Sequence, residues 1–480
     1  MQKQVFISKV VHMSFSMMVF NISQTLYSIY ISQKTGAECV GALHLIMSVY
    51  TVALTLASAG IGLTVTRVIS DIPGDAAKKQ ADGIILKCSK VCLAAAIFVG
   101  IILYAASGLI SDKALKIRSS AYLLKLLAVC LPAESLSAVL CGGFTAFGFV
   151  GFLSLGRLAR EASVWAATVF LMGRAASGRQ YEIIIISECI ASYVQCICDI
   201  FMYQGSRLGW HGRKTDVTYK KILSLCAPLA VGAYLRSGLA SAENILVPRF
   251  LNVTSEISPI EKYGTIKGMS IPVMMTAYVF VGSFAAMLVP EIARRKSIGH
   301  TNSVRYISSI SIKHILSFAL LISALLFTYH DRLCMLLYKN KNAGVYLGYL
   351  SALPVFMMTD TVTDALLKGL DRQVASLKIN IADSVMRVCL VVFLLPIFDI
   401  YGYIAILYIS EILNLSVSFY LLKKEINLKF PFSAIFAPCF SAAAAYACVN
   451  SFGSGAIAAS VSLFIAVYVT VLCTTRKIFC

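Results

Sequence analysis

The sequence is poor in charged residues and poor in the residue types that mark soluble active sites. Only 14% of its 480 residues are Asp, Glu, Lys or Arg, whereas soluble chains average about 25%. It has six histidines and two tryptophans, while 58% of the chain is apolar and the mean hydropathy is +0.80. This balance excludes a disordered chain and an ordinary soluble enzyme. It predicts an integral membrane protein.

Catalytic and metal-binding motifs are also missing from the sequence. It contains no P-loop, no GxSxG, no HExxH and no CxxC, and nearly all of its 15 cysteines stand inside apolar runs, as expected for small buried residues. We therefore expect a protein that is not an enzyme, with no catalytic residue, no metal site and no cofactor.

The formal net charge of +19 comes from Lys and Arg in short segments between apolar runs. No polar domain carries a basic stripe with interleaved aromatic residues, so we expect no nucleic-acid partner. Basic loops of this kind instead lie against anionic membrane lipids and set the orientation of the chain.

Apolar windows of about 20 residues, the length that crosses a bilayer as a helix, recur along the whole chain. The fourteen windows are 8–31, 42–66, 84–106, 120–143, 159–176, 182–204, 220–248, 268–290, 306–328, 346–367, 374–396, 401–422, 432–450 and 455–474. They predict an all-α membrane protein with about fourteen transmembrane helices. The even number places both termini on one side, and the excess of Lys and Arg on that side predicts that both are cytoplasmic.

The two halves of the sequence match weakly when they are aligned with each other. At an offset of 223 residues, Asn21 falls on Asn244 and Gly41 falls on Gly264. Parallel repeats are common in transporters. We therefore predict two six-helix lobes in the same direction followed by two extra helices, with an N-terminal lobe at 1–204, a cytoplasmic linker at 205–219, a C-terminal lobe at 220–430 and the extra pair at 431–480.

Charged residues inside the windows are the candidates for function, because each costs about 2.5–3.5 kcal/mol at the centre of a span unless it is paired, hydrated or used. They are Glu134, Glu188, Asp199, Arg236, Glu243, Asp360, Asp364, Asp383, Arg387 and Glu411. Their number indicates a water-filled cavity between helices.

Arg236 and Glu243 in the seventh window are seven residues apart, almost two helical turns, so both are expected on one face with Asn244 beside them. Arg236 either binds an anion or only neutralises a neighbouring carboxylate. In the first window, Asn21 and Gln24 share a face, and they either line the same cavity or hydrogen-bond between helices.

Two pairs of charges have the i, i+4 spacing of helical neighbours. Asp360 and Asp364 would repel each other, so we expect one of them to take a proton or a sodium ion, unless both are simply solvated. Asp383 and Arg387 form either a structural ion pair or a gate, and Glu134 is a similar candidate for ion coupling.

Six short motifs, in order along the chain, resemble the stage V sporulation protein B branch of the multidrug/oligosaccharidyl-lipid/polysaccharide (MOP) exporter superfamily. They are Gly36-Ala-Glu-Cys-Val-Gly-Ala-Leu, Ala57-Ser-Ala-Gly-Ile-Gly-Leu, Ala227-Pro-Leu, Ile245-Leu-Val-Pro-Arg-Phe-Leu, Tyr263-Gly followed by Gly268-Met-Ser-x-Pro272, and Leu288-Val-Pro-Glu-Ile-Ala. The resemblance extends over the first twelve windows and is strongest from 227 to 295.

The resemblance implies a MATE-like flippase in the bacterial cytoplasmic membrane. Such a protein moves a polyprenyl diphosphate-linked sugar or a peptidoglycan precursor by alternating access, in polysaccharide, cell-wall or spore-cortex synthesis, with H⁺ or Na⁺ as a possible coupling ion. Arg236 and Arg67 would hold the anionic head group. Relatives usually carry further arginines at the positions that match Ser28, Gln33 and Trp165 of this chain, so a diphosphate would be held less tightly here.

Two other functions fit the sequence. A cation-coupled multidrug exporter of the same fold would use Glu134, Glu243, Asp360 or Asp364 for the ion. A membrane scaffold that recruits envelope-synthesis enzymes without transporting anything would need none of the charged cavity residues.

Overall fold

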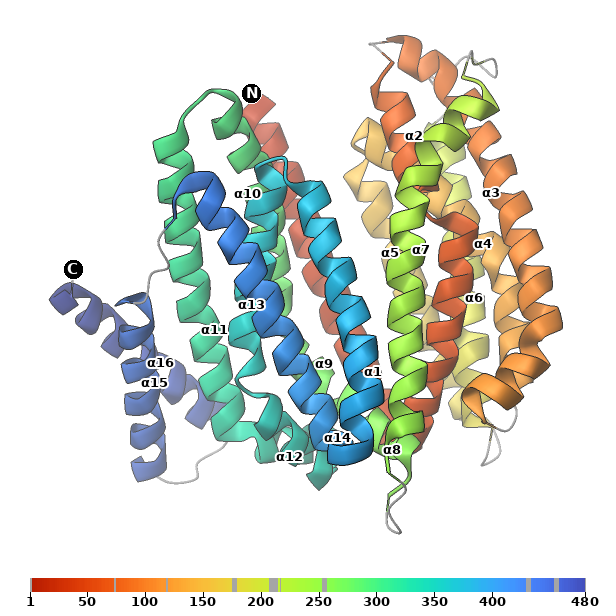
Figure 1. The fold of residues 1–480 in the computed structure, drawn as a ribbon. Helices are drawn as coiled ribbons and strands as arrows, with labels where there is room; N and C mark the ends of the chain where they lie inside the picture. The colour runs from red at the N-terminus through yellow and green to blue at the C-terminus, as the bar shows by residue number, and fades with distance from the viewer. Residues whose placement is uncertain are drawn as a thin grey trace. The chain divides into compact units, whose positions relative to one another are not determined.

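The computed structural model describes residues 2–72, 75–117, 120–174, 179–206, 215, 217–252, 257–428, 433–452 and 457–479, and within these ranges every regular element is a helix. The helices in chain order are α1 (Gln2–Ser58), α2 (Ile61–Ser70), α3 (Asp75–Leu109), the π-helical η1 (Ile110–Leu115), α4 (Ser120–Phe147), α5 (Val150–Met172), α6 (Gln180–Ser206), α7 (Tyr219–Phe250), α8 (Pro259–Thr265), the π-helical η3 (Ile266–Ser270), α9 (Ile271–Met275), α10 (Tyr278–Ser297), α11 (Thr301–Tyr338), α12 (Lys341–Leu350), α13 (Leu353–Gly369), α14 (Gln373–Ile426), α15 (Ser433–Phe452) and α16 (Ile457–Phe479) (Figure 1).

All fourteen apolar windows predicted from the sequence fall on these helices, so the predicted all-α membrane fold class is confirmed. One difference that bears on the site concerns the fifth window. It was predicted at 159–176, whereas α5 spans Val150–Met172, because the polar residues at its N-terminal end interrupt the apolar run without ending the helix.

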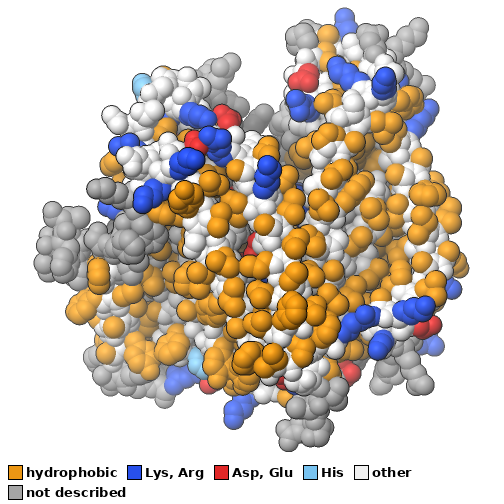
Figure 2. All heavy atoms as spheres, viewed as in Figure 1, with side chains coloured by type: hydrophobic (Ala, Val, Ile, Leu, Met, Phe, Trp, Pro, Cys, Tyr) orange, Lys and Arg blue, Asp and Glu red, His pale blue; other side chains and the backbone are white. Residues whose placement is uncertain are grey.

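The described helices have the length and composition of membrane spans. Seven are long and apolar enough to cross a bilayer, or up to nine if each of two bent helix pairs is one span. Large apolar side chains point outward from them, such as Phe98 on α3, Phe201 on α6 and Phe393 on α14. Figure 2 shows hydrophobic side chains over the middle of the helices and most of the charged ones near their ends. The chain is a multi-pass membrane protein.

Two of the long helices contain a reversal at a single residue. The backbone of α1 turns at Gly36, with φ 82° and ψ 170°, and that of α14 turns at Asp399, with φ 50° and ψ −135°. Glycine adopts positive φ without strain, whereas an aspartate there is held by its surroundings. The two segments of α14 run side by side in opposite directions (Figure 1), and Ser410 of the second segment donates to Asp383 of the first at 2.5 Å.

The chain divides into two compact units, and it passes between them within α1 and α7. Unit 1 comprises Met1–Tyr27 and Cys39–Leu246, and unit 2 comprises Ser28–Glu38 and Val247–Cys480. This division places most of α7 in unit 1, whereas the sequence predicts the boundary at 205–219, a segment that lies largely outside the described residues. The predicted lobes stay a prediction.

Each unit has its own apolar core. In unit 1, α2, α3 and α4 bury residues such as Val65, Ile84 and Phe144. In unit 2, α10, α11 and α13 do the same with residues such as Ile292 and Leu366. The C-terminal helices α15 and α16 pack on α11 through a smaller cluster.

That smaller cluster is anchored by aromatic residues. The Tyr468 hydroxyl donates to the carbonyl of Ser317 at 2.6 Å, and the rings of Tyr329 and Phe464 lie edge to face at 6.3 Å. The predicted extra helix pair is therefore held against unit 2 by packing as well as by a hydrogen bond.

Candidate functional site

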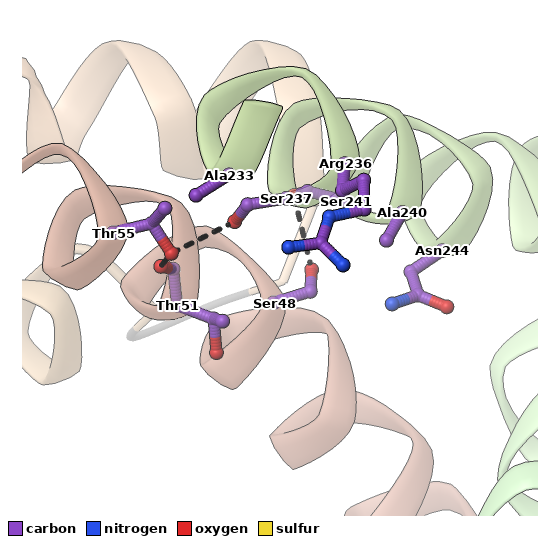
Figure 3. A pocket seen from close by; sticks show the side chains of 9 residues that line it. All are labelled: Ser48, Thr51, Thr55, Ala233, Arg236, Ser237, Ala240, Ser241 and Asn244. Atoms are coloured by element: carbon purple, nitrogen blue, oxygen red, sulfur yellow. Dashed lines mark hydrogen bonds between the residues drawn. The ribbon is translucent and has the colours of Figure 1, made fainter. Parts of the chain in front are cut away.

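A pocket of about 420 Å³ opens in unit 1 between the second half of α1 and the middle of α7 (Figure 3). Its lining consists of one arginine, five hydroxyl side chains, one amide and two alanines. These are Ser48, Thr51, Thr55, Ala233, Arg236, Ser237, Ala240, Ser241 and Asn244.

Helical spacing explains why these residues meet. Ser48, Thr51 and Thr55 recur every three or four positions on α1, and the lining residues of α7 follow the same period. The two faces are tied together by hydrogen bonds between Thr55 and Ser237 at 3.1 Å and between Ser241 and Ser48 at 3.5 Å, in which the α7 hydroxyls can donate to those of α1. Alanines at 233 and 240 leave the space open.

Arg236 lies near the middle of α7 and its side chain is exposed to the pocket (Figure 3). No Asp or Glu is among the lining residues. Within the part of the chain that the structure describes, its guanidinium makes no ion pair or hydrogen bond. A guanidinium can donate two parallel hydrogen bonds to a carboxylate or a phosphate.

The hydroxyl groups of α1 donate their hydrogens to their own helix. Ser48 donates to the carbonyl of Leu45 at 2.7 Å, Thr51 to that of Met47 at 2.8 Å, and Thr55 to that of Thr51 at 2.7 Å. Each hydroxyl carries one hydrogen and two acceptor lone pairs. The α1 wall of the pocket therefore presents acceptors, opposite the donors of Arg236 and Asn244.

Of the other residues predicted for the head-group site, Asn244 lines the pocket, whereas Asn21, Gln24 and Arg67 lie elsewhere. Glu243, predicted for ion coupling, is buried, with 3% of its surface exposed, and is not among the lining residues. Gln24 donates to Glu161 of α5 at 3.1 Å, and Asn21 is exposed outside the pocket. Arg67 is exposed in the last turn of α2.

A partly buried ionic network in unit 1 joins three helices. Arg160 of α5 donates to Glu134 of α4 and to Glu188 of α6, both at 3.0 Å. Ser192 of α6 donates to Glu134 at 2.7 Å, and Tyr50 of α1 neighbours the same carboxylate. Glu134, predicted to couple an ion, is thus an ion-pair partner of an arginine in this structure.

The sequence interpretation missed Arg160. The predicted window begins at residue 159, which puts Arg160 at the membrane surface, whereas it is the eleventh residue of the 23-residue α5. The position of Arg160 next to Glu161, which is buried, was the available signal. Adjacent residues on a helix point toward different neighbours, so the two charges contact different helices.

A second group of charges lies in unit 2 between α13 and α14. Asp383 faces Arg387 at 3.5 Å, as the i, i+4 spacing predicts. Asp364 pairs with Lys368 at 2.5 Å and accepts a hydrogen bond from Ser376. The sequence did not predict these partners of Asp364.

Asp360 differs from Asp364, although both stand on one face of α13. Its Oδ1 atom is buried and accepts no hydrogen bond from any residue that the structure describes. Glu411 lies within electrostatic reach of Asp360, Asp383 and Arg387. Among the described residues, this group contains four carboxylates, one arginine and one lysine, so acidic side chains outnumber basic ones.

Within the described residues, the fold and the pocket define an all-helical membrane protein with an arginine in a concave, hydroxyl-lined site. A family model described as "Polysaccharide biosynthesis protein" matches residues 253–470. A search of the curated proteins found no match.

The fold is that of MATE transporters and of the flippase MurJ. An inward-facing multidrug resistance MATE family transporter of the MOP superfamily matches with a TM-score of 0.70 at 14% identity, over 87% of this chain and 98% of its own. The lipid II flippase MurJ in an inward closed conformation matches with a TM-score of 0.68 at 14% identity, over 98% of both chains. A MOP superfamily transporter from Pyrococcus furiosus, whose description reports a reversed polarity of its binding pocket, matches with a TM-score of 0.63 at 15% identity over 91% and 96%.

The structural likeness shows that the chain has the fold of these transporters, and the family model matches less than half of the chain. They do not single out the stage V sporulation protein B branch that the sequence motifs resemble.

Proposed function

We propose that this protein is a flippase that moves a lipid-linked sugar with an anionic linker across the bacterial cytoplasmic membrane by alternating access, with both termini cytoplasmic. Its substrates belong to the polyprenyl-linked sugars or peptidoglycan precursors. Its product enters polysaccharide, wall or spore-cortex synthesis.

The observation that carries the proposal is the pocket at Arg236. A guanidinium without a carboxylate partner would bind a phosphate, and the surrounding hydroxyl and amide groups suit the hydroxyls of a sugar. The description of the matched family and the lipid II flippase among the structural neighbours agree with this assignment. Arg67, exposed at the end of α2, is proposed to attract the same head group at the membrane surface.

Ion coupling is assigned to the carboxylates of unit 2. A proton or Na⁺ that binds at Asp360, Asp383 or Glu411 would change the charge balance around Arg387 and so the energy of one conformation relative to the other. Glu134 and Glu243 are further candidates, although Glu134 is already paired with Arg160.

The test is a flipping assay with purified protein in liposomes. The liposomes carry a fluorescent polyprenyl-linked sugar, and an impermeant quencher measures how much label changes leaflet. We expect protein-dependent flipping that is lost in Arg236→Ala and partly kept in Arg236→Lys, because lysine keeps the charge and loses the bidentate geometry.

The matched control is Lys125→Ala in the same unit, which removes a positive charge that lies over the Tyr104 ring at 5.1 Å and outside the pocket. It should flip as fast as the wild type. Flipping that is absent in the wild type, with a proton or sodium gradient imposed, would overturn the proposal.

A second candidate function is a cation-coupled multidrug exporter. It is favoured by the excess of carboxylates in unit 2, where the buried Oδ1 of Asp360 accepts no hydrogen bond from the described chain. This alternative predicts gradient-driven efflux of a cationic dye that Asp360→Asn abolishes and that Arg236→Ala leaves unchanged.

A non-transporting scaffold is the third candidate. It predicts that a triple variant with Arg236→Ala, Glu243→Gln and Asp383→Asn keeps the cellular phenotype of the wild type. Loss of the phenotype with normal membrane insertion would rule the scaffold out.

A further inference from the structure

The charge and the hydrogen-bond polarity of the pocket select among phosphate-linked lipids. We infer that the Arg236 pocket takes a sugar joined to its lipid through a single phosphate, a phosphodiester with one negative charge, in preference to one joined through a diphosphate. The inference rests on the proposed flippase function and narrows its substrate class. The resemblance of the sequence to the superfamily implies a diphosphate.

The first argument is charge balance. The pocket lining carries one positive charge, on Arg236, and no negative charge. A phosphodiester brings one negative charge and is neutralised by one guanidinium, which can contact two of its oxygens at once. A diphosphate diester brings two negative charges, so one would stay uncompensated in a site between membrane helices, where an unpaired charge is costly.

The second argument is the polarity of the hydroxyl wall. A second phosphate placed beside the first would face the α1 side chains, and those of Ser48, Thr51 and Thr55 already donate their hydrogens to backbone carbonyls. Their lone pairs would meet anionic oxygens, which is repulsive. The same lone pairs suit the O–H groups of a sugar, which can donate to them.

The third argument concerns how the donors are grouped. Arg236 and Asn244 are eight residues apart on α7, a little over two turns, and both line the pocket (Figure 3). The donors therefore come from α7 and the acceptors of known orientation come from α1. A phosphate on the α7 side with its sugar against α1 satisfies both walls, and about 420 Å³ is in the lower range for ligand pockets.

The test compares two lipids that differ only in the linker. Each carries the same fluorescent sugar and the same polyprenyl chain, joined by one phosphate or by two, and both are assayed in liposomes with the impermeant quencher. We expect wild-type protein to flip the monophosphate lipid about tenfold faster or more, since an uncompensated charge costs more than the about 1.4 kcal/mol that a factor of ten represents.

A variant that adds a positive charge to the pocket tests the inference by a change of preference, so the result does not depend on a loss of function. Thr51→Arg places a second guanidinium in the pocket opposite Arg236, and it should shift the preference toward the diphosphate lipid. Thr51→Val removes one acceptor from the α1 wall without adding charge, so it should shift the preference toward the diphosphate lipid by less than Thr51→Arg does. Leu56→Lys adds a charge to an exposed position of the same helix outside the pocket lining and should leave the preference unchanged.

The outcomes separate the two proposals. If neither lipid is flipped above protein-free liposomes, the flippase function itself fails. If the wild type flips the diphosphate lipid as fast as the monophosphate lipid or faster, the function stands and the single-phosphate inference is overturned. If Thr51→Arg and Leu56→Lys shift the preference equally, the effect belongs to net charge and not to the pocket, which also overturns it.

Discussion

Arg160 of α5 and Glu134 of α4 pair at 3.0 Å inside unit 1, and a second carboxylate, that of Glu188, contacts the same guanidinium at 3.0 Å. The helices of unit 1 therefore carry two arginines that differ in their carboxylate partners. Arg160 is fully occupied by protein carboxylates, whereas Arg236 faces a pocket without any. The first ties helices together and the second is free for a ligand.

Replacing Arg160 should strongly destabilise the protein. Arg160→Met leaves two carboxylates without their cation, and breaking a buried pair in this way costs about 3–5 kcal/mol. Glu188→Gln should cost less, because the bond from Arg160 to Glu134 is kept. The measurement is the thermal unfolding midpoint of the purified protein in detergent.

The control for this prediction is Arg157→Met, which removes an exposed arginine from the same helix. It should leave the midpoint nearly unchanged. Equal midpoints for the two methionine variants would contradict a structural role for the Arg160 network.

A glycine contact sets how closely α2 and α4 approach. A Cβ atom at Gly142 would lie 2.5 Å from the carbonyl oxygen of Gly62 and 3.0 Å from its Cα. Both atoms belong to the backbone, so the helices themselves would have to separate. We expect Gly142→Ala to destabilise the protein by about 1–3 kcal/mol.

Gly108→Ala on α3 is the matched substitution, since a Cβ there meets nothing within 4 Å. It should be neutral or stabilising by up to about 1 kcal/mol, because alanine is the better helix former. Chemical denaturation of both variants in mixed micelles checks the pair, and a neutral Gly142→Ala would show that the two helices can separate without cost.

The turn of α14 depends on Lys262. This lysine, with 5% of its side chain exposed, pairs with Asp399 at 2.6 Å and donates to the carbonyl of Asn252 at 3.1 Å, while Asp399 accepts from the Asn252 amide at 3.0 Å. Lys262→Met removes two of these bonds, one of them to the Asp399 carboxylate, so we expect a loss of about 1–3 kcal/mol.

Asp399→Asn should cost less than Lys262→Met. Asparagine tolerates positive φ and keeps an oxygen for the Asn252 amide. Limited proteolysis and the thermal midpoint rank the two variants, and the reverse order would mean that the backbone conformation, more than the ion pair, needs an aspartate.

Filling the pocket should block transport without affecting stability. Ala240→Leu adds three carbon atoms to the lining, and we expect flipping to fall at least about tenfold with an unchanged unfolding midpoint. Val231→Leu enlarges an exposed residue of the same helix outside the lining and should flip normally. Normal flipping by Ala240→Leu would place the substrate route elsewhere.

Apolar length predicted the helices well, because spanning lipid requires a long apolar run and every backbone group must be bonded within its own helix. The same signal places helix ends poorly. At α5 the predicted start was nine residues late, and this error displaced Arg160 from the middle of a helix to its edge. The i, i+4 pair of Asp383 and Arg387 was predictable, since both partners are on one helix segment.

Contacts between helices could not be read from a single sequence. Asn21 and Gln24 of the first window were predicted either to line the cavity of Arg236 or to hydrogen-bond between helices, and the Arg236 pocket is lined instead by Ser48, Thr51 and Thr55 of the second window. Both sets have helical spacing, so their pattern alone does not decide between them. The choice depends on which faces pack together, and that is a property of the assembled unit.

The two partners of the Lys262–Asp399 ion pair are synthesised at different times. Lys262 precedes its partner by 137 residues, which a ribosome adds in roughly 7 to 27 s at about 5–20 residues per second. Lys262, the cation that neutralises Asp399 at the turn of α14, has therefore already been synthesised when Asp399 leaves the ribosome. The last two helices, α15 and α16, are synthesised only after this point. The two segments of α14 can therefore close as a hairpin before α15 and α16 are made and the chain completes its insertion.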